Sequence, residues 1–436
     1  MSGSRPSVLI VAAKWWPSSA RMAIALLRHG CRVSALCPAG HPLLHVSDID
    51  LLRRYSSISP LASLRRSIKA IHPDVIIPCD DGVVAQLHEL YRRESTMRPL
   101  IEASLGSPDS YSIVGSRYRL LGTSVQLGIP VPKTVRITTA DDLVQWHRSA
   151  PTESVVKIDG ESGGNGVRIC RSLDESLAAL KLFSTPTGSA TALKRLAIDR
   201  DPLALWMSRR QPNREITIQE FIAGRPANSL FVCRQGKVLS DLCVSVVASD
   251  GPTGAATIIR RIENQGMTQA AQYLASRLKL TGFYGLDFVM ASGTNIPYLI
   301  EMNPRCTQLG HLEFADQGSL AGVFSAAWRG ESRPLDIKRP IRAQLIAFFP
   351  QARVAGGVCN QFIDAGYHDV PIDEPRLVDE LMLRSWPERH WVARLYHSIK
   401  PRARSNPVVF EEINSTAARE VKSLPENSSA SVLGVP

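Results

Sequence analysis

The change in hydrophobic pattern after residue 137 most constrains the fold of this chain. Before it, short apolar stretches alternate with amphipathic helical ones, at 7–13, 19–30, 31–38, 61–72 and 73–79. Such alternation predicts parallel strands joined by crossover helices. From there to about residue 330, strand-like stretches dominate and favour antiparallel hairpins. The sequence therefore predicts an α/β domain with a parallel sheet followed by an α+β domain.

Length and charge set broad limits on function. The 436 residues are enough for two or three domains with substantial cores. The formal net charge is +11, which favours anionic partners such as nucleotides, nucleic acid or anionic membrane surfaces. No G-x-G-x-x-G follows the first strand, where "AKWWPSS" stands instead, so a classical dinucleotide site is not expected.

The cysteines indicate a reducing compartment. None of the eight forms a C-x-x-C pair, and most lie within apolar stretches. This pattern predicts reduced, buried thiols without a zinc site or disulfide framework. No stretch approaches the ~20 apolar residues that a membrane span needs. We therefore expect a cytoplasmic protein.

A glycine-rich turn separates two strand-like stretches in residues 155–170. It contains Gly160, Gly163, Gly164 and Gly166. Glycines allow a backbone to approach a ligand closely, and bare amides can bind phosphate. Lys157 lies just before the turn, where its ammonium could share that ligand. The alternatives are an ordinary long hairpin turn and a lysine that faces solvent at a strand edge.

A second hairpin carries paired carboxylates. If its turn is centred near Thr294, Asp287 and Glu301 lie opposite each other and point to one face. Asn303 shares that face, because it lies two residues beyond Glu301 in an extended chain. Two carboxylates and an amide oxygen suit Mg²⁺ (or Mn²⁺) with bound phosphates. The alternative is that Asp287 caps a turn and Glu301 pairs with Arg305.

The order of these motifs resembles that of ATP-grasp enzymes of the carboxylate–amine ligase type, similar to biotin carboxylase and the large chain of carbamoyl-phosphate synthetase. The resemblance covers roughly residues 7–330. Its motifs are "PDVIIPCDDGVV", "GSRYRLLGTSVQLGIPVPKT", "VVKIDGESGGNGV", "ITIQEFIAGRP", "GLDFVM" and "LIEMNPR". Such a protein would have a pre-ATP-grasp α/β domain, an ATP-grasp domain and a small C-terminal extension.

The resemblance implies roles for individual residues. Phosphates would be bound by Arg117 and Lys157 under a lid containing Gly163, Gly164 and Gly166. Adenine would be read by Glu220, Phe221 and Ile222, and the metal held by Asp287, Glu301 and Asn303. Arg305 would stabilise the transferring phosphoryl group, and Arg260, with its neighbour Arg261, is a candidate for binding a substrate carboxylate.

The predicted organisation has four segments. These are 1–115 (pre-ATP-grasp domain), 116–330 (ATP-grasp domain, with a glycine lid near 157–168 and a metal hairpin at 285–305), 331–400 (C-terminal extension) and 401–436 (disordered tail). The tail is Ser-rich and poorly patterned, which is typical of disorder.

The implied function is an ATP- and magnesium-dependent ligase that joins a carboxylate to an amine through an acyl phosphate. The alternative is an ATP-binding sensor or scaffold, because "GRPANS" puts Pro226 and Asn228 where the family commonly has a ribose-binding glutamate. The basic, aromatic stretch 384–404 leaves a membrane-surface contact open, while nucleic acid is not an expected partner. The substrates, the pathway and homodimer formation stay open.

Overall fold

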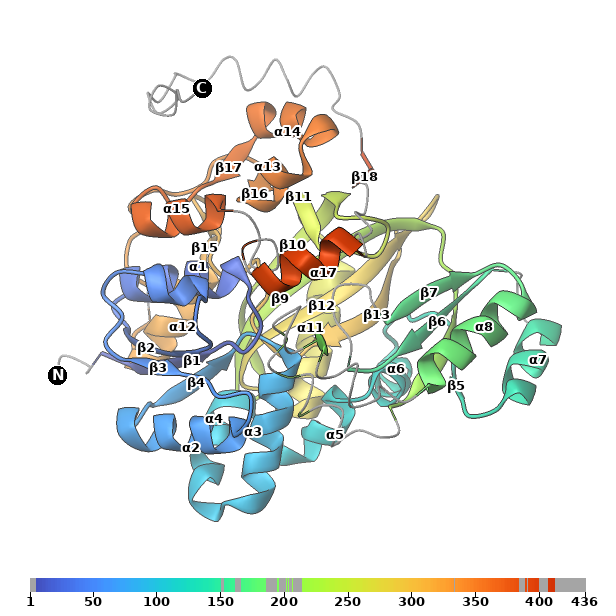
Figure 1. Cartoon of the computed structure of the whole chain (residues 1–436), viewed down its shortest axis with the longest axis horizontal. Helices are drawn as coiled ribbons and strands as arrows, with labels where there is room; N and C mark the ends of the chain where they lie inside the picture. The colour runs from blue at the N-terminus through green and yellow to red at the C-terminus, as the bar shows by residue number, and fades with distance from the viewer. Residues whose placement is uncertain are drawn as a thin grey trace.

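The computed structural model describes most of the chain. The described residues are 5–149, 153–160, 166–185, 194–195, 201, 203, 206, 214–332, 334–383, 389, 391–399 and 407–411. In Figure 1 the N-terminal sheet lies on the left, a large sheet lies in the centre and a small sheet lies on the right. No helix in the described part of the chain is long and apolar enough to cross a membrane.

The N-terminal sheet is parallel, with the strand order β3-β2-β1-β4. Its strands are β1 (Ser7–Val11), β2 (Arg32–Cys37), β3 (Leu52–Arg54) and β4 (Val75–Pro78). Its helices are α1 (Pro17–Arg28), α2 (Pro60–Ile71), α3 (Asp81–Arg93) and α4 (Arg98–Leu105). Alternate residues of β1 enter two different cores, as period-two strand geometry requires. The predicted parallel α/β sheet is confirmed.

The small sheet is antiparallel, with the order β5-β8-β6-β7. Its strands are β5 (Thr134–Ile137), β6 (Ser154–Ile158), β7 (Val167–Cys170) and β8 (Ile216–Glu220). The helices α7 (Ala140–Ser149) and α8 (Leu173–Ser184) cover its outer face (Figure 1). The short helices α5 (Tyr111–Val114) and α6 (Arg117–Gln126) link it to the N-terminal sheet. The small sheet therefore carries Lys157 and the two ends of the glycine turn.

The large sheet has the order β13-β12-β9-β10-β11-β16-β17. Its strands are β9 (Gly224–Arg234), β10 (Lys237–Ser249), β11 (Ala256–Ile262), β12 (Gly282–Ala291), β13 (Pro297–Asn303), β16 (Leu345–Phe348) and β17 (Tyr367–Asp369). All neighbours are antiparallel except β16 and β17. α11 (Gln265–Leu278) packs on one face and α12 (Leu320–Arg329) on the other. A two-stranded ribbon, β14 (Glu313–Phe314) with β15 (Gly318–Ser319), precedes α12.

The C-terminal part of the chain extends the large sheet. Besides β16 and β17 it contains α13 (Gln351–Ala355), α14 (Asn360–Ala365), α15 (Pro375–Met382) and α17 (Trp391–Ile399). Trp391 is 72% exposed, but most of the stretch 384–404 lies outside the described residues. The divisions predicted at residues 115, 330 and 400 stay predictions.

One strand contradicts the expected disorder of residues 401–436. β18 (Val408–Val409) pairs with Ala248 and Ser249 of β10, and the amide of Phe410 donates to the carbonyl of Val247 over 2.8 Å. The sequence does not predict this strand, because two valines between Ser-rich segments are too few to form a recognisable strand pattern. The remainder of the predicted tail, 401–406 and 412–436, lies outside the described residues.

A continuous hydrophobic core joins the N-terminal sheet to the large sheet. It includes Val8 and Ile10 of β1, Leu230 of β9, Val244 of β10 and Phe324 of α12, all nearly inaccessible to solvent. Burial of this much apolar surface is the main source of the free energy that holds such units together. All eight cysteines are buried and free, which confirms the predicted buried thiols. The shared core fixes the carboxyl edge of the parallel sheet against the large sheet.

Candidate active site

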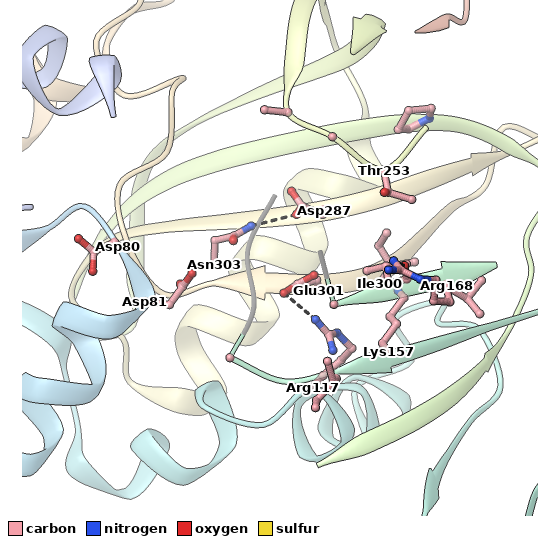
Figure 2. A pocket seen from close by; sticks show the side chains of 18 of the residues that line it. Asp80, Asp81, Arg117, Lys157, Arg168, Thr253, Asp287, Ile300, Glu301 and Asn303 are labelled. Carbon is pink, nitrogen blue, oxygen red and sulfur yellow. Dashed lines mark hydrogen bonds and ion pairs between the residues drawn. The ribbon is translucent and has the colours of Figure 1, made fainter. Parts of the chain in front are cut away.

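A single cleft of about 2280 Å³ lies where the three sheets meet. Its walls come from the carboxyl ends of β1, β2 and β4, from the inner face of the small sheet, and from β9, β12 and β13. Figure 2 shows that side chains from the small sheet and from the large sheet point toward one another across it. Every predicted site residue that the structure describes lines this cleft, except Arg260 and its neighbour Arg261.

The hairpin of β12 and β13 brings the predicted carboxylates together. Asp287 pairs with Glu301, as the sequence predicts. Nearer the turn, the register differs by one residue from that of a symmetric hairpin, since Phe288 pairs with Leu299 and not with Ile300. A β-bulge at Ile300 adds the missing residue. Without that bulge the two carboxylates would not lie opposite each other.

Asp287 is held between two neighbouring strands. Its Oδ2 accepts a hydrogen bond from the side-chain amide of Asn303 on β13 over 3.0 Å (Figure 2). Its Oδ1 accepts one from Asn228 on β9 over 2.6 Å, and Asn228 is its cross-strand partner there. Burial, and secondly the negative charge of Glu301, raise the pKa of Asp287 to about 6.

Arg117 connects the two sheets electrostatically. Its guanidinium donates to Asp159 over 2.8 Å and to Glu301 over 2.9 Å; Figure 2 marks the second bond. The side chain is only 6% exposed. Burial opposes its charge, but Glu301 and Asp159 outweigh burial and raise the pKa of Arg117. A cation therefore lies beside the carboxylate pair.

Lys157 is buried on β6 and faces the same cleft. Its Nζ donates to Oε1 of Gln219 over 2.7 Å, and the amide of Gln219 donates to Thr134 over 3.1 Å. Burial, and secondly the nearby charge of Arg117, lower the pKa of Lys157 to about 7. The alternative of a solvent-facing lysine is therefore wrong.

The glycine turn is described only at its two ends. The amide of Ile158 donates to the carbonyl of Gly166 over 2.9 Å, so β6 and β7 form the expected hairpin. Gly160 adopts a φ of 82°, which favours glycine. Gly166 lines the cleft. The predicted lid residues Gly163 and Gly164 lie outside the described residues.

The predicted adenine-reading segment forms the rim between the small and large sheets. Glu220 ends β8, and Phe221 and Ile222 lead into β9; all three line the cleft. The amide of Glu220 donates to the carbonyl of Lys133 over 2.9 Å, and that of Phe221 to the carbonyl of Glu153 over 3.4 Å. Backbone bonds to both neighbouring segments hold this rim in place.

Arg305 follows β13 and reaches the N-terminal sheet. Its Nε donates to Asp81 over 3.0 Å, and a terminal nitrogen donates to Oδ1 of Asn303 over 3.0 Å. Burial opposes the charge, but Asp81 outweighs burial and raises the pKa of Arg305. The alternative pairing of Glu301 with Arg305 is not what the structure has, because the carboxylate of Glu301 pairs with Arg117.

Arg260 does not belong to this constellation. Its Nε donates to Glu411 over 3.0 Å, and its side chain is not part of the cleft lining. Arg261 forms a two-pronged ion pair with Asp316 at 2.5 Å, also away from the cleft. The predicted substrate contact by Arg260 conflicts with this geometry, since its guanidinium anchors the segment that follows β18.

Comparisons with known proteins agree with this arrangement. Residues 202–308 match the sequence model of the ATP-grasp domain family. The chain carries an ATP-grasp domain. The matched part includes the rim at Glu220 and the whole β12–β13 hairpin. No protein of curated function matches the chain in sequence.

Solved structures share the fold of the chain around this ATP-grasp domain. The N5-carboxyaminoimidazole synthetase of Staphylococcus aureus, complexed with ADP, has a TM-score of 0.54 at 15% identity, over 77% of this chain and 80% of that one. The biotin carboxylase domain of Hydrogenobacter thermophilus 2-oxoglutarate carboxylase gives 0.51 at 12%, over 77% and 71%. Phosphoribosylamine–glycine ligase of Thermotoga maritima gives 0.50 at 16%, over 75% and 76%.

The acidic hairpin of the ATP-grasp domain suits a divalent metal. Asp287 and Glu301 offer carboxylate oxygens and Asn303 an amide oxygen, which are hard donors. A cation between them would relieve the repulsion that helps to raise the pKa of Asp287. No group of three or more His, Cys, Asp or Glu side chains placed to hold a metal occurs among the described residues, but the predicted set needs only two carboxylates.

Four residues of the site were not predicted in their observed roles. Asn228 bonds Asp287, Asp159 bonds Arg117, Gln219 bonds Lys157, and Asp81 bonds Arg305. Asn228 and Gln219 sit on strands next to the residues they contact, so strand order would have revealed them. Asp81 lies in α3, which follows the N-terminal sheet, and no local pattern predicts its contact with Arg305.

Proposed function

We propose that this protein is an ATP- and magnesium-dependent ligase that joins a carboxylate to an amine through an acyl phosphate. One observation carries the proposal: the buried Lys157 of the small sheet, the buried Arg117 of α6 and the carboxylates of the large sheet converge on one cleft. A cationic phosphate site beside a carboxylate metal site is what ATP-dependent phosphoryl transfer requires. A protein that only bound a nucleotide would need no second carboxylate.

The names of the structural neighbours favour the same reaction class. They include a carboxyaminoimidazole synthetase with ADP, a phosphoribosylamine–glycine ligase, and a biotin carboxylase domain with MgADP and bicarbonate. Each of the three is named for a ligase, synthetase or carboxylase activity. The ATP-grasp domain that this chain carries is consistent with that class.

The nucleotide would lie along the small sheet. Adenine would meet the rim formed by Glu220, Phe221 and Ile222, whose backbone groups supply hydrogen bonds at fixed positions. The phosphates would lie against Lys157 and Arg117. The turn that contains Gly163, Gly164 and Gly166 would close over the phosphates and exclude water.

The reacting phosphate would lie next to the acidic hairpin. Asp287, Glu301 and Asn303 would hold Mg²⁺ or Mn²⁺, which supplies charge neutralisation between the phosphate oxygens when bound. Arg305 would stabilise the negative charge on the transferring phosphoryl group. Arg117 is already beside Glu301, so the cation and the carboxylate sites share a boundary, and the γ-phosphate would lie there.

The chemistry then needs only positioning and charge stabilisation. A carboxylate oxygen of the acid attacks the γ-phosphorus of ATP, the bond to the bridging oxygen breaks, and ADP leaves. The amine attacks the acyl carbon of the acyl phosphate, loses a proton, and expels inorganic phosphate. The product is an amide, and the bridging bond of ATP is the only high-energy bond consumed.

A phosphate-release screen tests this proposal. Purified protein with Mg-ATP would be supplied with pairs of amino acids and small carboxylates, and the proposal expects ADP and phosphate in a 1:1 ratio that requires both co-substrates. Glu301→Gln should abolish the signal while calorimetry still detects ATP binding. Tight ATP binding without turnover over a broad substrate panel would instead favour a sensor or scaffold.

A further inference from the structure

The contact between Asp81 and Arg305 joins two separate sheets at the proposed reaction centre. Asp81 is the first residue of α3, three residues after the end of β4 in the N-terminal sheet. Arg305 follows β13 of the large sheet. Figure 2 shows Asp81 near Asn303, at the end of the metal hairpin that lies away from Lys157. The 3.0 Å bond therefore spans from one wall of the cleft to another.

The residue next to each partner is anchored by hydrogen bonds of its own. The carboxylate of Asp80 accepts bonds from the amides of Ala13 and Val83 over 2.6 and 2.9 Å, which ties the start of α3 to the end of β1. On the other side, the amide of Cys306 donates to the carbonyl of Pro78 over 3.2 Å. The two strand ends are thus docked on each other independently of the Asp81–Arg305 bond.

The exposure of the ion pair argues against a purely structural role. The side chain of Asp81 is 41% exposed and faces the cleft. An ion pair with so exposed a partner contributes little to the free energy of unfolding. Its larger effect is on geometry, because an arginine side chain has many rotamers and each fixed nitrogen removes some of them.

We propose that Asp81 is a positioning residue that fixes the guanidinium of Arg305 for contact with the transferring phosphoryl group. Asp81 holds Nε and Asn303 holds one terminal nitrogen, which together fix the plane of the guanidinium. The inference rests on the proposed function, and it makes the N-terminal sheet part of the catalytic apparatus. The phosphoryl-stabilising charge would then depend on a residue outside the matched ATP-grasp segment.

Binding of inorganic phosphate to the ADP-bound protein separates positioning from simple electrostatics. Asp81→Asn removes a negative charge next to Arg305, so electrostatics alone predicts tighter phosphate binding. Loss of positioning predicts weaker binding, by about 3- to 10-fold, because a neutral amide oxygen accepts a weaker hydrogen bond from Nε than the carboxylate does and holds the guanidinium less firmly toward the anion. Calorimetry with phosphate and Mg-ADP on the full chain measures the sign of the change.

Turnover supplies the second readout. Asp81→Asn should lower kcat by about 10- to 100-fold and leave KM for ATP within about 2-fold, since only the transition state needs the oriented charge. In an Arg305→Lys background the same substitution should have little further effect. Asp373→Asn is the matched control: its carboxylate is 45% exposed and pairs with Arg28 and Arg339 away from the cleft, so it should match the wild type.

The two readouts also separate this inference from the proposed function. If wild-type protein turns over and Asp81→Asn binds phosphate as well as or better than the wild type, the positioning role is refuted while the ligase stands. If no substrate supports turnover but Asp81→Asn weakens phosphate binding, the ligase proposal fails, while Asp81 still positions Arg305 toward a bound phosphate. Absence of phosphate binding by the wild-type ADP complex overturns the positioning role as well.

Discussion

The two ends of the cleft differ in how their polar groups are satisfied. At the end formed by β12 and β13, charges neutralise one another: Arg117 bonds Glu301, and Arg305 bonds Asp81. At the rim end, the bonds do not pair opposite charges: Lys157 donates to the amide oxygen of Gln219, and the rim at Glu220 is held through backbone groups. The first, charge-dense end is therefore held by ion pairs, and the second by bonds to neutral groups.

This difference matches the two parts of the proposed ligand. A nucleotide base needs shape and fixed hydrogen bonds, which backbone groups supply without a large desolvation cost. A triphosphate with its metal must instead exchange protein ion pairs for its own. Under the proposed function, the charge-dense end would govern catalysis and the small sheet would govern affinity.

The largest effect is expected at the acidic hairpin. Glu301→Gln removes a proposed metal ligand and the partner of Arg117, so substrate-dependent ADP release should fall by more than ~100-fold. ATP affinity should change by only a few-fold, because the rim and Lys157 are untouched. Coupled ADP assays and calorimetry measure the two quantities. The control is Glu263→Gln, at a position outside the cleft, which should turn over like the wild type. Turnover near wild type in Glu301→Gln would refute the metal assignment.

Lys157 should show the opposite pattern. Lys157→Ala removes a buried cation that faces the proposed phosphates, so the Kd for ATP should rise by about 10- to 100-fold, as for a lost charge-assisted hydrogen bond. Lys237→Ala, an exposed lysine on β10, should leave the Kd unchanged. Titration calorimetry with Mg-ATP decides the matter, and an unaltered Kd in Lys157→Ala would remove this residue from the nucleotide site.

A pH dependence should follow from the same lysine. Burial, and secondly the charge of Arg117, lower the pKa of Lys157 to about 7 in the ligand-free protein. The negative charges of Glu301, Asp287 and Asp159 partly oppose this shift. Phosphates favour the protonated ammonium, so binding above pH 7 requires proton uptake, and ATP affinity should fall as the pH rises, by up to ~10-fold per unit. Below pH 7 the lysine is already protonated and this effect disappears.

Lys157→Ala is also the control for that pH profile. The variant retains every other titrating group, including those of the nucleotide, and should lose the decline in affinity between pH 7 and about 9. Isothermal titration in buffers of different ionisation enthalpy measures the proton uptake directly. The same slope in the variant and in the wild type would assign the titration to another group.

The smallest effect is expected at Arg260. Because its guanidinium pairs with Glu411 outside the cleft lining, Arg260→Ala should change kcat/KM by less than ~3-fold, as for most substitutions away from a site. Arg305→Ala, in the same assay, should abolish turnover. A large loss in Arg260→Ala, with unchanged thermal stability, would restore this arginine as a substrate contact.

The fold could be predicted largely from local patterns. Buried apolar strands and amphipathic helices identified the N-terminal parallel sheet and the hairpins, since each pattern reports directly on burial. Strand β3 was missed because its Leu52, Arg53 and Arg54 are exposed. The pairing of β16 with β11 is a long-range contact, which a pattern of four apolar residues cannot specify.

The candidate site was predictable where its chemistry repeats a local spacing. Asp287 and Glu301 were placed opposite each other by assuming a symmetric turn, yet the register depends on the bulge at Ile300, which nothing in the sequence announces. Arg260 was misplaced because its partner lies 151 residues away, in a segment without a pattern. The types of residue in a motif predict the chemistry of a site. The partners that these residues contact on distant segments can be identified only from the folded structure.

The strand β18 has a practical consequence for anyone producing the protein. Phe410, which follows it, lines the cleft beside the loop at residues 252–256. A version truncated before residue 407 would lack Phe410 from the cleft lining and leave Arg260 without the carboxylate of Glu411. Affinity tags are therefore better fused to the amino terminus, and substrate screens should use protein whose carboxyl-terminal segment is intact.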